Sequence, residues 1–113
     1  MLRGFMTGAP EPATSVTPGG TTAGTAALVT ARVTVVSTGV GLTAAILPTG
    51  VPGMWFVVGI DSVTTARLFT QSSDVLYVGG VVYDNTTPYQ IVANKAVMVA
   101  CVSENAWFGV ALG

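Results

Sequence analysis

The stretch Leu28-Val29-Thr30-Ala31-Arg32-Val33-Thr34-Val35 alternates two sets of side chains. This is the period of two that is typical of a half-buried strand, in which successive side chains point to opposite faces. Most of these residues are β-branched or small, and β-branched side chains favour strands over helices. The stretch therefore predicts an extended strand within residues 26–35.

Similar segments follow toward the C-terminus, and Gly, Pro, Asn, Asp and Ser separate them. The further expected strands are residues 42–47, 54–60, 63–69, 75–78, 81–83, 89–93, 96–102 and 107–112. No segment has the apolar periodicity of a helix over a useful length. Parallel strands are usually connected by helices, so the lack of predicted helices favours antiparallel sheets. We therefore expect an all-β fold, a small antiparallel β-sandwich or β-barrel.

The first 24 residues differ from the rest of the chain because Pro and Gly recur among Thr, Ser and Ala. These residues disfavour both helix and strand, so we expect an extended N-terminal arm at 1–24 and a single β-domain at 25–113. Two interpretations of the arm stay open, a disordered terminus or a segment that becomes ordered on a neighbour. The large apolar side chains of Leu2, Phe5 and Met6 favour the second.

Charge is scarce along the whole chain. Its 113 residues include only four basic and five acidic side chains, and the net charge is −1. About a quarter of the residues are charged in an average soluble domain, and charge keeps apolar surface from associating. We therefore expect a subunit whose uncharged surface is buried in an assembly. Four scattered cations give no basic stripe for nucleic acid, and no apolar run approaches the ~18 residues of a membrane-spanning helix.

The residue types of catalytic and metal sites are almost missing from the sequence. There is no histidine, and Cys101 is the single cysteine, which we interpret as a buried, inert thiol. Asp61, Asp74 and Asp84 each lie in a turn context, where an Asp side chain commonly binds its own backbone. We expect no catalytic, cofactor-binding or metal-binding residues, no cofactor, and no enzymatic activity.

Trp55 and Trp107 are the largest side chains, and both lie in expected strands. Aromatic residues at such positions are usually core or interface anchors, and this is our interpretation of both. The alternative is a carbohydrate or base-stacking site that also uses the tyrosines at 77, 83 and 89. Exposure of the rings to solvent would separate the two.

One ordered series of motifs runs through the expected β-domain. Leu47-Pro48 and Val51-Pro52-Gly53 precede the strand Val57-Val58-Gly59-Ile60, and the apolar run 96–102 is followed by Trp107. This order resembles small virion proteins of tailed bacteriophages, notably capsid decoration (cement) proteins, head-fibre proteins and some fibre-tip modules. The resemblance covers residues 25–112 and depends on the order and apolar character of these segments, with no chemically necessary residue among them. The chain departs from the usual pattern of these proteins at Gly59, a position at which they often have an asparagine.

The resemblance implies a virion structural protein, a capsid decoration protein that binds the outer capsid surface as a homotrimer and stabilises the head. Its partners would be the major capsid protein and other copies of the chain, and Leu2, Phe5 and Met6 would contact the capsid or a neighbouring subunit. The protein would be made in the host cytoplasm and reside on the capsid surface. Alternatives are a tail-fibre or host-adhesion module that binds glycan, and a neck or tail component.

Overall fold

The computed structural model describes residues 14–16, 19–38, 41, 43–60 and 65–112. The regular elements of these residues are all strands, apart from one 3-10 turn, η1 (Ala23–Thr25). The strands are β1 (Thr14–Val16), β2 (Ala27–Leu28), β3 (Val33–Val36), β4 (Ala44–Ile46), β5 (Trp55–Ile60), β6 (Ala66–Phe69), β7 (Val75–Val78), β8 (Val81–Tyr83), β9 (Tyr89–Ile91), β10 (Ala96–Ser103) and β11 (Ala106–Leu112). The predicted all-β class is confirmed for this part of the chain. Within it, no helix is long and apolar enough to cross a bilayer.

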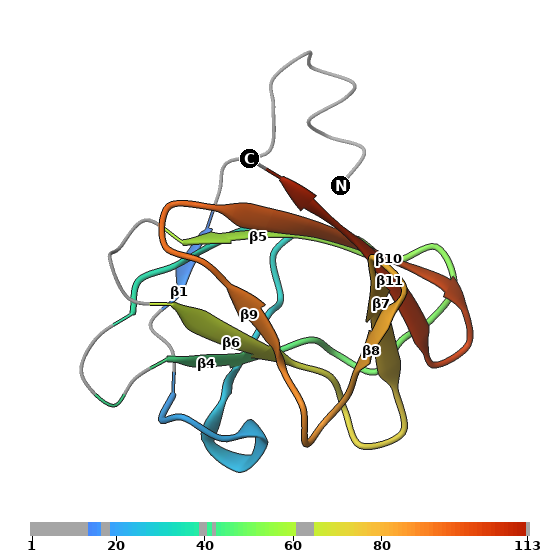
Figure 1. Cartoon of the computed structure of the whole chain (residues 1–113), viewed down its shortest axis with the longest axis horizontal. Coiled ribbons are helices and arrows are strands. Elements are labelled where there is room, and N and C mark those ends of the chain that lie inside the picture. Colours follow the sequence, from blue (N-terminus) through green and yellow to red (C-terminus); the bar gives the residue numbers. More distant parts are fainter. Residues whose placement is uncertain (1–13, 17–18, 39–40, 42, 61–64, 113) are drawn as a thin grey trace.

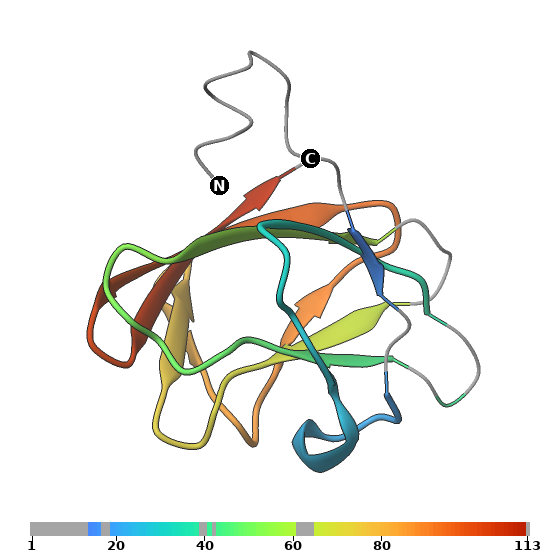
Figure 2. The same ribbon diagram turned by 180° about the vertical axis from the view of Figure 1, so that it is seen from behind.

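The strands form two sheets that pack against each other. The large sheet has the order β1-β3-β5-β10-β11-β7-β8, and the small sheet has the order β2-β4-β6-β9. Figure 1 shows β5 and β10 of the large sheet above β4 and β6 of the small sheet, with β7 and β8 on the right-hand side. The same two layers are seen from behind in Figure 2. Both sheets end in open edges, so the described residues form no closed barrel, and that alternative is wrong.

The predicted antiparallel arrangement is also wrong, because both sheets are mixed. The pairs β1–β3, β3–β5, β2–β4, β4–β6 and β7–β11 are parallel. The pairs β5–β10, β10–β11, β6–β9 and β7–β8 are antiparallel. From β2 to β7 the chain alternates between the sheets, so a strand of the opposite sheet makes each crossover in place of a helix. The absence of helices therefore did not exclude parallel pairs.

The alternating stretch that begins the expected domain divides between the two sheets. Leu28 ends β2 in the small sheet, and Val33 begins β3 in the large sheet. At the bend between them, the hydroxyl of Thr34 donates a hydrogen bond to the Ala31 carbonyl at 2.8 Å. The expected strands at 54–60 and 96–102 agree closely with β5 and β10.

Residues before 25 contain a strand that the sequence did not predict. Thr14–Val16 forms β1, which pairs in parallel with β3 at the edge of the large sheet. Further along, the carbonyl of Gly20 accepts hydrogen bonds from the N–H groups of Thr43 and Ala44. A positive φ of 57° at Gly20 suits glycine, which explains how a Gly-rich segment packs on the body. The division of the chain at residue 24 stays a prediction, and residues 1–13 lie outside the described ranges.

The core lies between the sheets. Inward side chains of β5, β10 and β11 in the large sheet meet those of β4, β6 and β9 in the small sheet. The largest fully buried members include Trp107, Leu47, Leu68, Leu76 and Ile91. The rings of Phe56 and Trp107 lie 5.9 Å apart within this cluster. Burial of these side chains holds the two layers together.

Candidate interaction face

The outward side of the large sheet carries apolar side chains across six strands, and we call it the outer face. Residue pairing between neighbouring strands places its side chains in three rows. The rows are Val35, Gly59, Ala96 and Leu112; Val33, Val57, Met98 and Val110; and Trp55, Ala100, Phe108, Tyr77 and Val82. The alternate residues on β3, β5 and β10 are buried in the core. No position in the three rows has a charged side chain.

Several of these side chains are well exposed. The exposed fraction is 60% for Val110, 47% for Phe108 and 42% for Met98. Phe108 stacks on Tyr77 with ring centroids 4.9 Å apart. Arg32 is beside the face, with its guanidinium 4.7 Å from the centre of the half-buried Trp55 ring. A contiguous exposed apolar surface of this kind is typical of an interaction site.

The corresponding side of the small sheet is covered by the chain itself. Ala44, Ile46 and Phe69 form a second apolar cluster against Ala23 and Ala26. The segment that covers them is fixed by backbone hydrogen bonds to residues 43 and 44, and by the Arg67 guanidinium, which donates to the Thr21 carbonyl at 3.1 Å. The two sheets therefore differ, because no comparable packing segment from the described ranges is recorded over the outer face.

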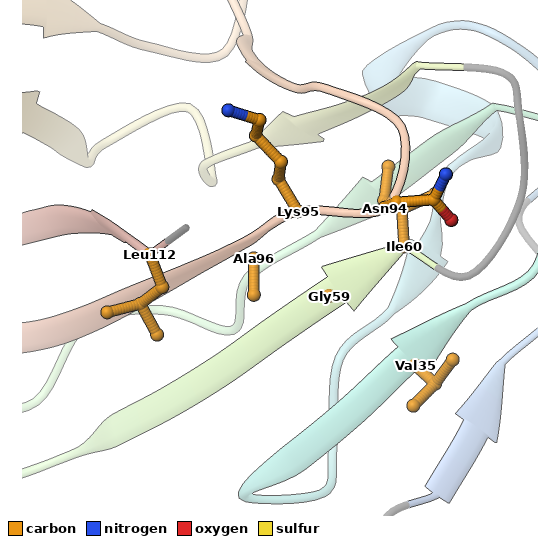
Figure 3. Close-up of a pocket in the computed structure, with 7 residues that line it drawn as sticks. All are labelled: Val35, Gly59, Ile60, Asn94, Lys95, Ala96 and Leu112. Atoms are coloured by element: carbon orange, nitrogen blue, oxygen red, sulfur yellow. The ribbon is translucent and has the colours of Figure 1, made fainter.

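A shallow hollow of about 380 Å³ lies at the end of the first row, between β3, β5, β10 and β11. Figure 3 shows Gly59, Ala96 and Leu112 on neighbouring strands, with Val35 on the next strand. The centre of the row has little side-chain volume, since it holds a glycine and an alanine. A Cβ atom at Gly59 would lie 3.3 Å from the Ala96 Cβ, so the small residue keeps this place open.

A second hollow, of about 390 Å³, lies on the small-sheet side and is lined by both polar and apolar residues. Arg67, Gln90, Asn85 and Thr86 are among the residues that line it. The Asn85 amide already donates to the Thr70 carbonyl at 2.7 Å, and the Thr86 hydroxyl donates to Asp84 at 2.9 Å. Much of the hydrogen-bonding capacity here is therefore used within the chain.

Asp74 is the main buried polar group among the described residues, and the prediction that its side chain binds the backbone of its own turn is wrong. It is 2% exposed, and its Oδ2 accepts from the Gly50 N–H at 2.7 Å and from Trp107 Nε1 at 3.3 Å. Its Oδ1 accepts from Asn105 Nδ2 at 2.6 Å and from the Ser73 hydroxyl at 3.1 Å. The carboxylate thus joins the loop before β5, the turn before β7 and the start of β11. The arrangement is fully bonded, which indicates a structural role.

The other two titratable groups of interest have simple surroundings. Asp84 accepts at Oδ1 from the N–H groups of Thr86 and Thr87 and from the Thr86 hydroxyl, as predicted for a turn aspartate. These hydrogen bonds, led by the Thr86 N–H, lower the pKa of the Asp84 carboxyl. Cys101 is buried, and burial raises the pKa of its thiol, which favours the unreactive protonated form. No group of three potential metal ligands occurs among the residues described.

The structure separates the residues that the sequence singled out. Trp107 is fully buried in the core, whereas Trp55 is half-buried on the outer face. Leu2, Phe5 and Met6 lie outside the described residues. The sequence analysis did not identify the outer face. Apolar residues occur on both sides of β10 and β11, and this pattern could have indicated a second apolar surface. Nor did it identify the hydrogen bonds of Asp74 to Gly50 and Asn105, because these residues are far from Asp74 in the chain.

Matching against protein-family models, against curated proteins and against solved structures gave no match to the chain.

Proposed function

We propose that the chain is a structural protein of a tailed-bacteriophage virion, a capsid decoration protein that assembles as a homotrimer and binds the outer capsid surface. It has no catalytic role in this proposal and stabilises the head through contact area. The order of motifs over residues 25–112 supports the phage assignment by resemblance. The charge-free outer face supports the assembly, and it is the observation on which the proposal depends.

The size of the outer face is suited to an interface. Strands lie about 4.8 Å apart and outward residues about 6.6 Å apart along a strand, so each covers about 30 Å² and the three rows project roughly 400 Å². Apolar patches of 300–600 Å² are the largest on typical monomers and often mark functional surfaces. A standard interface buries about 800 Å² on each partner. The outer face therefore supplies about half of one interface.

A glycan-binding adhesion module is the second candidate, and the stack of the exposed Phe108 ring on the half-buried Tyr77 ring favours it. An aromatic platform can hold the apolar side of a sugar ring. A sugar site also needs polar groups that fix the orientation of the ring hydroxyls. Around this stack, the same row holds Ala100 and Val82, and the neighbouring row holds Met98 and Val110. These apolar neighbours favour a protein partner over a glycan.

Two valines of similar exposure allow a matched test of the outer face. Val110 lies on the face and is 60% exposed, whereas Val92 lies outside its rows and is 54% exposed. In light scattering, the wild-type protein and Val92→Lys should have three times the subunit mass of 11.4 kDa at micromolar concentration. Val110→Lys should shift toward the monomer, because a buried lysine charge in the interface lacks a partner. A monomeric wild-type protein would refute the proposed assembly.

Location on the particle separates decoration from adhesion. Antibodies against the chain, imaged on virions by electron microscopy, should label the head. Labelling confined to the tail tip would favour the adhesion module, and labelling at the neck would favour a neck component.

A further inference from the structure

We propose that the hollow on the outer face is a receptor for Phe5 of a neighbouring subunit. The inference rests on the homo-oligomer proposed above and names a contact that would hold it together. The occupant is the apolar part of residues 1–13, a segment of this chain that lies outside the described ranges.

The hollow has the chemistry and size for an apolar side chain. Val35, Ala96 and Leu112 give it apolar walls, and Gly59 leaves its centre open. Asn94 and Lys95 also line it, and both are exposed, so they place polar groups at its rim. Its volume of about 380 Å³ falls in the range of small-ligand sites, roughly 300–1,000 Å³. A phenylalanine gains much from such a site because aromatic side chains bury about 150–250 Å² each.

The point at which residues 1–13 join the body brings them close to the outer face. They connect to β1, which pairs with β3 at the edge of the same sheet. Ser15 is level with Val35, which pairs with Gly59, so the hollow begins one strand away from β1. The segment that carries Leu2, Phe5 and Met6 therefore leaves the body next to the face that has no cover from the described chain.

Proline spacing favours the hollow of another subunit over the subunit's own. Ala9 and Glu11 each precede a proline, which favours extended backbone at about 3.1 Å per residue. Five residues of extended backbone span about 15 Å, and β1 begins on the side away from the row that contains the hollow, since Thr14 pairs with Thr34 and Ser15 with Val35. Four further steps of the chain lead from Ala9 to Phe5 and cover about 14 Å at most. To reach the hollow of its own subunit, Phe5 would have to come back about 15 Å along the strand direction and cross about 12 Å of sheet, a straight-line distance of about 19 Å. The backbone from Ala9 to Phe5 is shorter than that distance.

Mixed cross-linking tests the contact and its direction. Phe5→Cys and Ala96→Cys variants, carrying different tags, are co-expressed as full chains and oxidised with diamide. A disulfide-linked dimer that contains both tags is expected on non-reducing gels. Phe5→Cys co-expressed with Val92→Cys is the matched control, since position 92 is exposed but outside the hollow. The wild-type protein reports the background from the buried Cys101.

The outcomes separate this contact from the proposed assembly. A trimer in light scattering without the two-tag dimer would overturn the receptor and leave the assembly standing. A double variant that carries both Phe5→Cys and Ala96→Cys tests the direction of the contact. If its disulfide forms only within single chains, the assignment to a neighbouring subunit is overturned. A monomeric protein would overturn the proposed assembly itself.

A hollow-filling variant gives a test that needs no introduced cysteine. Arg3, two residues from Phe5, is a trypsin site whose cleavage is followed by mass spectrometry of the assembled full chain. Ala96→Leu should fill the hollow and remove protection of Arg3. Val92→Leu, at an exposed position outside the outer face and outside the hollow, should keep it. Equal cleavage in the two variants would overturn the inference.

Discussion

Replacement of Asp74 tests whether one buried carboxylate holds three loops of the fold together. In Asp74→Ala, the Gly50 N–H and Trp107 Nε1 both lose their acceptor, and both residues are buried. Asn105 and Ser73 also lose a partner, but their side chains are nearer to solvent. The loss therefore depends mainly on the two buried donors.

The expected magnitude follows from those donors. An unsatisfied buried donor costs about 1–3 kcal/mol, so two cost about 2–6 kcal/mol. Removing the carboxylate also relieves the cost of its own burial, which brings the expected loss to roughly 2–4 kcal/mol. Since domains of this size have about 5–15 kcal/mol of stability, the loss is a large fraction. At about 4 °C per kcal/mol, Tm should fall by about 8–16 °C.

Asp74→Asn should be much less damaging, because of how the hydrogen bonds divide between the two oxygens. Both buried donors bind Oδ2, which an asparagine oxygen can replace. The groups at Oδ1 are an amide and a hydroxyl, and both can turn to present an oxygen to the new NH₂ group. Hydrogen-bond geometry, and not charge, then accounts for most of the stabilisation.

Urea unfolding followed by tryptophan fluorescence measures the free energy of unfolding of each variant. Asp84→Ala is the control, since this aspartate also accepts three hydrogen bonds but on an exposed loop, where water can replace it. We expect Asp74→Ala to lose far more stability than either Asp74→Asn or the control. Equal losses in Asp74→Ala and Asp74→Asn would refute the division of roles between the oxygens, and a negligible loss in Asp74→Ala would refute the buried-donor account.

Three further outcomes are expected. Gly50→Ala should lower the free energy of unfolding by about 1–3 kcal/mol, because the new Cβ would lie 2.9 Å from Cys101 Sγ and 3.0 Å from Trp107 Nε1; urea melts measure this. The Cys101 thiol should react with DTNB at pH 8 only after unfolding, since burial raises its pKa above the ordinary 9.0; rapid reaction of the native protein would contradict its burial. Hydrogen bonds lower the pKa of Asp84, so its contribution to stability is present above pH 3.8 and is lost as the pH falls through the lower pKa of the folded state. The difference in free energy of unfolding between wild type and Asp84→Asn should therefore shrink in acid. A difference that stays constant with pH would contradict this.

The sequence predicted the elements of the fold better than their arrangement. Dense apolar patterns at 54–60 and 96–102 identified β5 and β10 because strand periodicity is a local property. Whether neighbouring strands run parallel depends on which sheet each strand joins, and no local pattern encodes that. The alternating stretch from Leu28 to Val35 shows the difficulty, since it changes sheet without interrupting its period.

The candidate face could be predicted only in part. Scarcity of charge correctly raises the expectation of uncharged surface, but it gives no location for it. The apolar residues of the expected strand at 54–60 suggest a strand covered on both faces, whereas Trp55 and Val57 are half-buried on the outward side. Apolar side chains on both sides of a strand are equally consistent with a central core strand and with an interface strand. Only the presence or absence of a further layer over the outward side of the sheet separates these cases.

The alternation of the chain between two sheets has a kinetic consequence. Each parallel pair from β2 to β6 is completed only after an intervening strand has joined the opposite layer, so neither layer can form by itself. Pairings between distant segments must close long loops before they gain stability, and such topologies fold slowly, in milliseconds to seconds. Unfolding must likewise separate both layers together, which favours a single cooperative transition. A protein with this connectivity would fold slowly and then resist partial opening.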